Sequence, residues 1–144
     1  MTYVKSVLKY VALFLFGGVT YYLIEILWRG YSHWTMFMLG GLCFVAVGLI
    51  NNIFPWTMKL ELQAFIGAII ITLLELIVGL IVNVMLNWSV WDYSDMPFNF
   101  LGQICLPFSL LWYVLSIVII LLDDYIRYKF FGEQKPTYIS IFSK

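Results

Sequence analysis

Glu75 is the residue whose type and position most directly indicate chemistry. It is the only formally charged residue in an apolar stretch from Leu62 to Leu86. An ionisable side chain near the centre of a membrane span costs at least about 2–3 kcal/mol, and such residues are normally paired, protonated or exposed to water. Glu75 is therefore a candidate for the centre of a transport or binding site.

A second acidic residue, Glu25, precedes Arg29 by four positions near the end of the first apolar segment. An acidic residue four positions before a basic one is the favourable order for an ion pair on a helix. Two interpretations stay open. The pair is either a structural ion pair at the membrane interface or an anion site on Arg29 that Glu25 orients.

Ser32, His33 and Asp92 supply the side chains of a hydrolytic triad in the two predicted outer loops. Ser32 and His33 are sequence neighbours, however, and the glycine pattern of a nucleophile turn is missing. We therefore expect no catalysis by this trio. His33 is expected to form hydrogen bonds at the interface or to accept a proton on the route to Glu75.

No metal site or cofactor is predicted. The chain has a single histidine, and its two cysteines are isolated, so neither the histidine nor the cysteines form a metal or redox motif. A glycine-rich phosphate loop ending in Lys-Ser or Lys-Thr does not occur.

The second outer loop is rich in aromatic and polar residues. Tryptophan and tyrosine commonly anchor at the membrane interface, which explains the rings. The polar residues are expected either to cap the fourth helix or to close an outer vestibule above Glu75. The candidates in this loop are Trp91, Asp92, Tyr93, Ser94, Asn99 and Gly102.

Composition places these residues in a membrane protein. The chain of 144 residues is 63% hydrophobic and 11% charged, whereas a soluble domain carries about 25% charged residues. Four apolar segments are long enough to cross about 30 Å of hydrocarbon. They predict an all-α, four-helix transmembrane bundle of two hairpins, with helices over residues 4–28, 34–54, 62–86 and 102–122.

These helices form one transmembrane domain, residues 1–130, followed by a short tail at 131–144. The two hairpins carry similar features, since Glu25 and Glu75 each precede a glycine and an aromatic outer loop. Repeats of this kind occur in transporters. A tandem repeat and a coincidence both stay open.

Cationic residues predict the orientation of the bundle. With four helices, Arg29 alone falls on one side, and the other seven cations fall on the opposite side: Lys5, Lys9, Lys59, Arg127, Lys129, Lys135 and Lys144. The positive-inside rule then places both termini in the cytoplasm. Zero net charge and the absence of a basic cluster argue against nucleic-acid binding.

Small and polar residues recur at helical spacing along the third segment: Ala68, Thr72, Glu75, Gly79 and Asn83. Small residues let membrane helices approach closely, and polar residues form hydrogen bonds between them. Packing explains the small residues. It explains Glu75 less well, because packing does not require a carboxyl group.

Several of these motifs resemble one family. The run Tyr22–Met36, the Gly40-Gly41-Leu42 triplet, Glu75 with Gly79 and Asn83, and the loop Trp91–Ser94 with Asn99 and Gly102 are similar to the bacterial membrane family called putative ABC-transporter type IV. The resemblance covers about residues 14–130 and implies a small multi-pass protein of the bacterial cell membrane. The positions that carry over are Glu25, Arg29, Ser32, His33, Trp34, Glu75, Asn83, Trp91, Asp92, Tyr93, Ser94, Asn99 and Gly102.

The function that these observations favour is a membrane transport component for a small solute or ion, with a polar centre around Glu75 open to the outer face. Four helices enclose little volume, so a homo-oligomer or a partner membrane subunit is expected. The family name implies an ATPase subunit, whereas the predicted internal cytoplasmic connection, Pro55–Glu61, is short for the coupling helix on which an ATPase would dock. The alternative is an assembly or sensory protein that binds a lipid or envelope partner through its outer aromatic loops.

Overall fold

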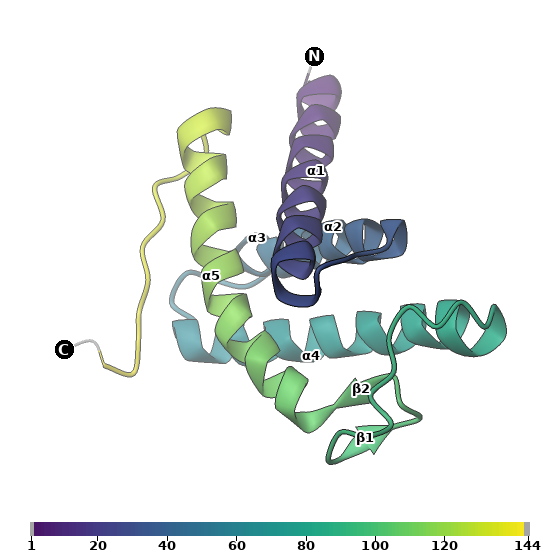
Figure 1. Cartoon of the computed structure of the whole chain (residues 1–144). Coiled ribbons are helices and arrows are strands. Elements are labelled where there is room, and N and C mark those ends of the chain that lie inside the picture. Colours follow the sequence, from purple (N-terminus) through teal and green to yellow (C-terminus); the bar gives the residue numbers. More distant parts are fainter. Residues whose placement is uncertain (1, 143–144) are drawn as a thin grey trace.

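Four long apolar helices make up most of the chain in this computed structural model, which describes residues 2–142 (Figure 1). About 70% of the structure is helical. In chain order the elements are α1 (Thr2–Arg29), α2 (Trp34–Gly48), α3 (Ile50–Ile53), α4 (Leu60–Gly79), the π-helical turn η1 (Leu80–Met85), β1 (Asn99–Phe100), β2 (Ile104–Cys105) and α5 (Leu106–Phe131).

Four helical segments are long and apolar enough to cross a membrane: Tyr3–Arg29, Trp34–Ile53, Leu60–Met85 and Leu106–Phe131. Each has 20 residues or more, which spans about 30 Å at 1.5 Å per residue. These segments confirm the prediction of a mostly helical chain with four helices able to span a membrane. The two-hairpin arrangement and the side of the membrane on which the termini lie stay predictions.

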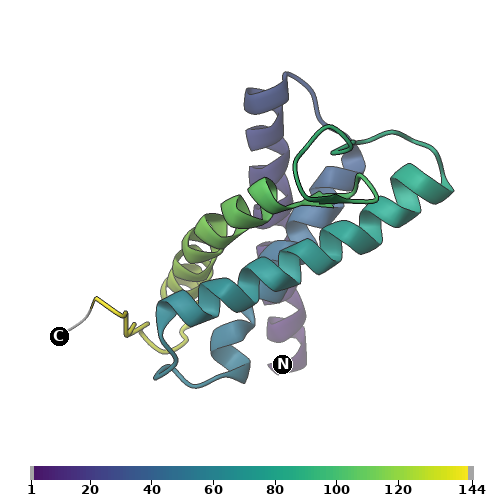
Figure 2. The same ribbon diagram turned by 90° about the horizontal axis from the view of Figure 1, so that it is seen from below.

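The helices do not run as one set of parallel rods. In Figure 1, α1 and α5 run from top to bottom, whereas α2 and α4 run from side to side. The view from below shows α4 lying across α2, with α5 beside it (Figure 2). α1 packs mainly against α2, and α4 packs mainly against α5, while α1 and α5 touch each other at few points.

Glycines allow the close contact between α1 and α2. A Cβ atom on Gly40 would lie 2.5 Å from the Cβ of Tyr21, and one on Gly41 would lie 2.8 Å from the backbone oxygen of Phe14. Both distances are shorter than van der Waals contact, so only glycine fits at this approach. The packing interpretation of the small residues therefore holds here.

The helices differ from their predicted bounds, the first by only one or two residues at each end. The predicted helix 34–54 is divided at Leu49 into α2 and α3, and the helix predicted at 62–86 begins at Leu60 and continues as η1. The fourth helix begins at Leu106 rather than at Gly102 because the residues before it form the β1–β2 pair. It ends at Phe131 rather than at residue 122, nine residues later than predicted.

One end of the molecule gathers both terminal parts of the chain. Lys9 Nζ lies 3.3 Å from a carboxylate oxygen of Glu133, which joins α1 to the segment after α5. The Leu60 amide donates to the Ile139 carbonyl at 2.7 Å, which holds the tail against the start of α4. Arg29 lies at the far end of α1. Lys144 lies outside the described residues.

Candidate functional site

Glu75 lies inside the helix assembly, on α4, with 3% of its surface exposed. Its Oε2 accepts a hydrogen bond of 2.9 Å from the Tyr93 hydroxyl, and its Oε1 accepts one of 3.2 Å from the Trp112 indole. Both donors are neutral. Within residues 2–142, none of the ion pairs includes Glu75.

Two different elements supply these donors. Trp112 projects from the first half of α5, which packs against α4. Tyr93 comes from the segment between η1 and α5, residues 86–105, which we call the outer loop after its predicted position. Its ring stacks on that of Phe108, with ring centroids 4.8 Å apart. Burial, with the neighbouring Glu75 as a further cause, raises the pKa of Tyr93 above its ordinary value. The hydroxyl therefore keeps its proton and remains a donor to Glu75.

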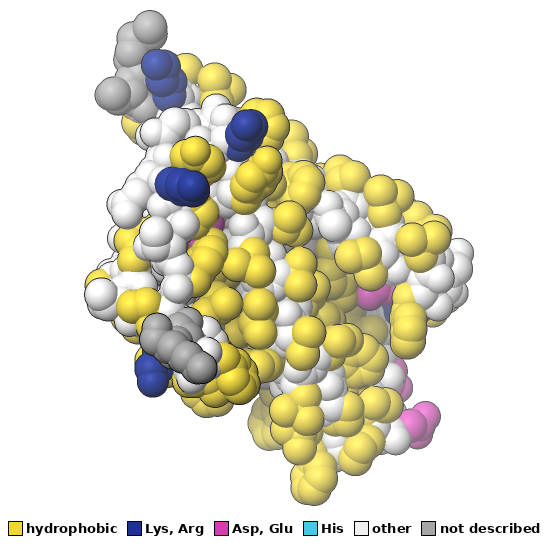
Figure 3. Space-filling view, turned by 90° about the vertical axis from the view of Figure 1, so that its left-hand side faces the viewer, with side chains coloured by type: hydrophobic (Ala, Val, Ile, Leu, Met, Phe, Trp, Pro, Cys, Tyr) yellow, Lys and Arg dark blue, Asp and Glu magenta, His cyan; other side chains and the backbone are white. Residues whose placement is uncertain are grey.

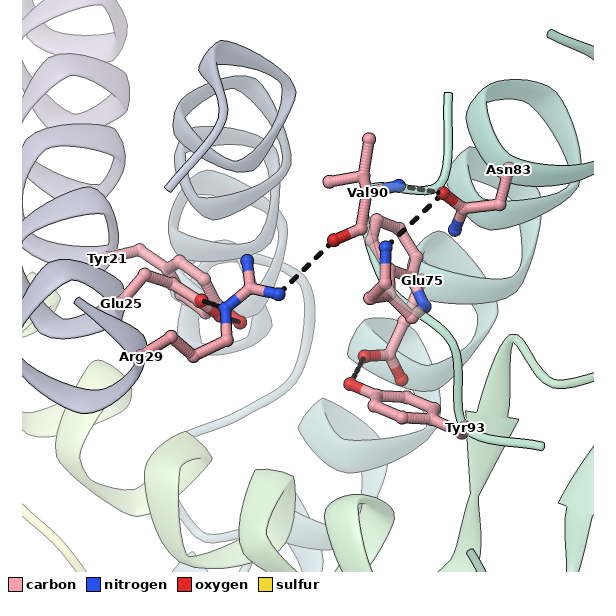
Figure 4. Close-up of polar contacts among 8 residues, drawn as sticks. Tyr21, Glu25, Arg29, Glu75, Asn83, Val90 and Tyr93 are labelled. Carbon is pink, nitrogen blue, oxygen red and sulfur yellow. Dashed lines mark hydrogen bonds and ion pairs between the residues drawn. The ribbon is translucent and has the colours of Figure 1, made fainter. Parts of the chain in front are cut away.

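A second series of polar contacts runs along one face of α1, where Tyr21, Glu25 and Arg29 are spaced four residues apart (Figure 4). The Tyr21 hydroxyl donates to Glu25 Oε1 at 3.0 Å, and Arg29 Nε lies 2.5 Å from Glu25 Oε2. Arg29 Nη1 also donates to the Val90 carbonyl at 3.2 Å, which joins α1 to the outer loop. The predicted i, i+4 pair is present, and both its charges are partly buried.

Asn83 fastens the outer loop to η1. Its Oδ1 accepts from the amides of Val90 and Trp91 at 2.6 and 3.4 Å, and its Nδ2 donates to Gln103 Oε1 at 2.8 Å. The Gln103 carbonyl in turn accepts from the Trp91 indole at 3.0 Å. Asn83 therefore holds the segment that carries Tyr93 close to α4.

Other residues of the predicted polar stripe serve packing. Thr72 and Ser109 share a hydrogen bond of 3.0 Å between α4 and α5. A Cβ atom on Gly79 would lie 2.6 Å from Gln103 Oε1, so the glycine leaves room for that side chain. Among the stripe residues, Glu75 and Asn83 carry the polar contacts near the outer loop.

Two adjoining cavities lie beside these residues. The larger holds about 370 Å³, and its polar lining residues include Glu25, Arg29 and Tyr93. The smaller holds about 100 Å³ and is lined by Glu75 among mostly apolar side chains. The two cavities share four lining residues, Tyr21, Ile24, Trp112 and Leu115.

The structure brings only part of the predicted site together. Glu25, Arg29, Tyr93 and Trp91 line the larger cavity, and Glu75 lies next to it. The other predicted residues line neither cavity, although Asn83 supports the loop. They are Ser32, His33, Asp92, Ser94, Asn99 and Gly102.

His33 has a structural place at the start of α2. Its Nδ1 accepts from the Thr35 amide at 3.2 Å and lies 2.7 Å from the Thr35 hydroxyl. Its ring contacts those of Trp34 and Trp88, with centroids 5.6 and 5.9 Å away. The side-chain oxygen of Ser32 is buried and has no hydrogen-bond partner among the described residues. This geometry gives a helix cap rather than a hydrolytic triad.

Asp92 and Asn99 build turns in the outer loop. Asp92 Oδ1 accepts from the Ser94 amide at 2.9 Å, a contact that lowers the pKa of this exposed carboxyl. Asn99 Oδ1 accepts from the Gly102 amide at 3.1 Å. Gly102 has a φ of 70°, and an added Cβ would lie 3.0 Å from Asp92 Oδ1. Neither Asp92 nor Asn99 caps the fourth helix, because α5 begins after Cys105.

Sequence reasoning missed a buried ionic cluster at the opposite end of α5. Asp123 and Arg127 are 0% and 2% exposed and form an ion pair of 2.8 Å. Asp124 Oδ2 accepts from Asn51 at 2.5 Å and from the Tyr138 hydroxyl at 2.9 Å. The i, i+4 spacing of Asp123 and Arg127 is a signal in the sequence, but the predicted helix ended before it.

A family model described as "Putative ABC-transporter type IV" matches residues 12–143, most of the chain. The chain belongs to this family. No curated protein and no solved structure matches it. Membership and the four apolar helices together make the chain a multi-pass membrane protein of an ABC-transporter-type family.

Proposed function

We propose that the chain is a membrane transport component for a small solute or ion, with its polar centre at Glu75 and its entry from the outer face. The observation that supports this proposal is the environment of Glu75. The carboxyl is buried, bonded to two neutral donors, and adjacent to a cavity of about 370 Å³. Burying an ionisable group without a counter-ion is costly, and in membranes such groups usually mark a pathway or a binding site.

Protonation of Glu75 would couple to movement of the substrate. Tyr93 lines the larger cavity, and its hydroxyl donates a hydrogen bond to Glu75. Tyr93 therefore connects the larger cavity to Glu75. A substrate or proton arriving from that cavity would reach Tyr93 before Glu75. The Glu25–Arg29 pair would line the same entry.

The proposal includes the membrane, the orientation and the partners of the protein. Lys9 and Arg127 both lie near Glu133, which supports cytoplasmic termini in a bacterial cell membrane by the positive-inside rule. The cavities are small, so we propose a homo-oligomer or a partner membrane subunit. The family name is the support for an ATPase subunit.

Exposed aromatic residues favour a second candidate function. Trp28, Tyr31 and Trp34 are 81%, 63% and 60% exposed around the first outer loop. In this alternative the chain is an assembly or sensory protein whose outer loops bind a lipid or an envelope partner. Glu75 would then stabilise the helices through Tyr93 and Trp112 without any transport.

Exchange of Glu75 for glutamine separates the two functions. We expect wild-type protein in liposomes to dissipate an imposed pH gradient, measured with an internal pH-sensitive dye. Glu75→Gln keeps the shape and an acceptor for Trp112 but cannot ionise, so its flux is expected to fall to that of empty liposomes.

Glu61→Gln is the matched control, since Glu61 lies on the same helix but at its end, bonded to Ser140. Its flux should equal that of wild type. Equal flux in wild type and Glu75→Gln would remove Glu75 from the pathway. A loss of thermal stability in Glu75→Gln, with no flux in wild type, would favour the assembly function.

A further inference from the structure

The two cavities beside Glu75 form one groove between α1 and α5. They share Tyr21 and Ile24 on α1 and Trp112 and Leu115 on α5, so the two spaces adjoin along both helices. Side chains of α2 and α4 line the smaller cavity from behind. We use "the α1–α5 groove" for the space that these two cavities make together.

The length of the α1–α5 groove matches one leaflet of a bilayer. Its lining residues on α1 extend from Phe16 to Arg29, which corresponds to about 20 Å at 1.5 Å per residue. One leaflet contributes about 15 Å of hydrocarbon to the membrane. The groove is therefore long enough to hold most of an acyl chain lying along α1.

The walls of the groove are almost entirely aliphatic and aromatic. Its acidic and basic members are Glu75 near the middle and the Glu25–Arg29 pair at one end, where Trp28 also lies. Since both Glu75 oxygens already accept hydrogen bonds, the surface offered along the groove is apolar. This lining suits a hydrocarbon chain.

The groove opens sideways between the helices. Ile24 and Leu111 line it and are also 49% and 50% exposed, so the walls continue onto the outer surface of the assembly. On the face in Figure 3, hydrophobic side chains cover most of the surface, and a hollow between them shows acidic and basic side chains. In a membrane this opening faces lipid tails, which are as apolar as leucine.

Arg29 leaves a donor free at the charged end of the groove. Its Nε and Nη1 contact Glu25 and the Val90 carbonyl, whereas Nη2 is buried and has no hydrogen-bond partner among the described residues. Glu25 is already engaged by Tyr21 and Arg29. A buried donor without a partner is costly, and an arginine fork suits phosphate oxygens.

We propose that the α1–α5 groove binds a phospholipid, with one acyl chain along α1 and its phosphate at Arg29. The acyl chain enters through the lateral opening, and the phosphate pairs with the guanidinium of Arg29, whose side chain lines the larger cavity and is 22% exposed. The inference deepens the proposed function, on which it rests, by assigning the substrate to a class. That class is an amphiphile with an anionic oxygen-bearing head, which enters the groove from the outer leaflet of the membrane.

Photolabelling in vesicles tests this assignment. The probe is a phospholipid with a diazirine near the end of one acyl chain, mixed in trace amounts into vesicles that contain the whole protein. After illumination, peptide mass spectrometry locates the label. We expect it on the inner wall, at Tyr21, Trp112 and Leu115, in excess over outward-facing residues of the same helices.

Two tryptophan variants of α1 form a matched pair. Ile24→Trp places a large side chain in the groove, whereas Leu23→Trp places it on the 54% exposed neighbour that lines neither cavity. Ile24→Trp is expected to lower labelling of the inner wall about tenfold. This is the loss of affinity expected when about two methylene groups of the acyl chain lose their apolar contacts. Leu23→Trp should label like wild type, and circular dichroism should show equal helix content in both.

The head group is tested with a diacylglycerol that carries the same diazirine chain. We expect it to label the inner wall less than the phospholipid does, and added inorganic phosphate to leave phospholipid labelling unchanged. Equal labelling by both lipids would overturn the assignment of phosphate to Arg29. Labelling spread evenly over outward-facing residues, with no difference between the two variants, would overturn the groove as a phospholipid site. That result would fit a groove that a second copy of the chain covers.

The liposome flux separates this inference from the proposed function. Labelling of the inner wall without any flux in wild type would leave the phospholipid site standing and contradict transport. Flux that depends on Glu75 without labelling of the inner wall would leave transport standing and contradict the phospholipid as its substrate.

Discussion

Replacing Arg127 with methionine is expected to lower the free energy of unfolding by about 3–5 kcal/mol. Asp123 is fully buried, and Arg127 is its ion-pair partner at 2.8 Å. Removing the guanidinium leaves a buried carboxylate without compensation, which costs far more than the pair itself contributes. The measurement is reversible unfolding in mixed detergent micelles, followed by circular dichroism.

Lys129→Met is the control for this substitution, because Lys129 is an exposed cation on the same helix. Its free energy of unfolding should lie within about 0.5 kcal/mol of that of wild type. The double variant Asp123→Asn with Arg127→Met removes both charges and is expected to recover much of the loss. If Arg127→Met and Lys129→Met had equal free energies of unfolding, the buried Asp123–Arg127 pair would not contribute to stability.

Asn83→Leu is expected to weaken the attachment of the outer loop and to lower the free energy of unfolding by about 1–3 kcal/mol. The substitution removes the acceptor of the Val90 and Trp91 amides and the donor to Gln103. The loop that carries Tyr93 would then be released from η1. Loss of the Tyr93–Glu75 hydrogen bond is the expected consequence for the site.

Two readouts check this prediction. Unfolding in detergent measures stability, and hydrogen exchange at residues 88–94 measures the loosening of the loop. Asn52→Leu supplies the same chemical change at an exposed position. If Asn83→Leu left exchange of the Val90 amide as slow as in wild type, Asn83 would not hold this loop.

The burial of Glu75 and the Glu25–Arg29 pair could be predicted from the sequence. A single charge in an apolar span has one low-energy place, inside the helix assembly, and i, i+4 spacing brings opposite charges together on any helix. The partners of Glu75 could not be predicted in the same way. Trp112 shares a helix face with Ser109 and Ser116, but that spacing does not indicate a contact with Glu75. Tyr93 reaches Glu75 from a loop whose path depends on tertiary contacts.

That path is set by local conformations that the sequence does not announce. Asn87, Ser89, Phe98 and Leu101 all adopt positive φ in the outer loop, although none is a glycine. The fourth helix shows a related limit. Hydropathy falls at Asp123-Asp124, which suggests a helix end. The structure continues the helix, because Arg127 forms an ion pair with Asp123, and Asn51 and Tyr138 donate hydrogen bonds to Asp124.

Reversible closure of the α1–α5 groove tests the transport account most directly. Ile24→Cys and Leu115→Cys place thiols on its two walls in a chain whose native Cys43 and Cys105 are changed to alanine. A short bis-thiol reagent that reductant cleaves would join them, and liposome flux is measured before joining, after it and after reduction. The pair Leu23→Cys and Val114→Cys, on exposed positions outside the groove, is the control.

The account predicts that joining residues 24 and 115 stops the flux, that reduction restores it, and that the control pair conducts throughout. Unchanged flux with the groove held closed would contradict it.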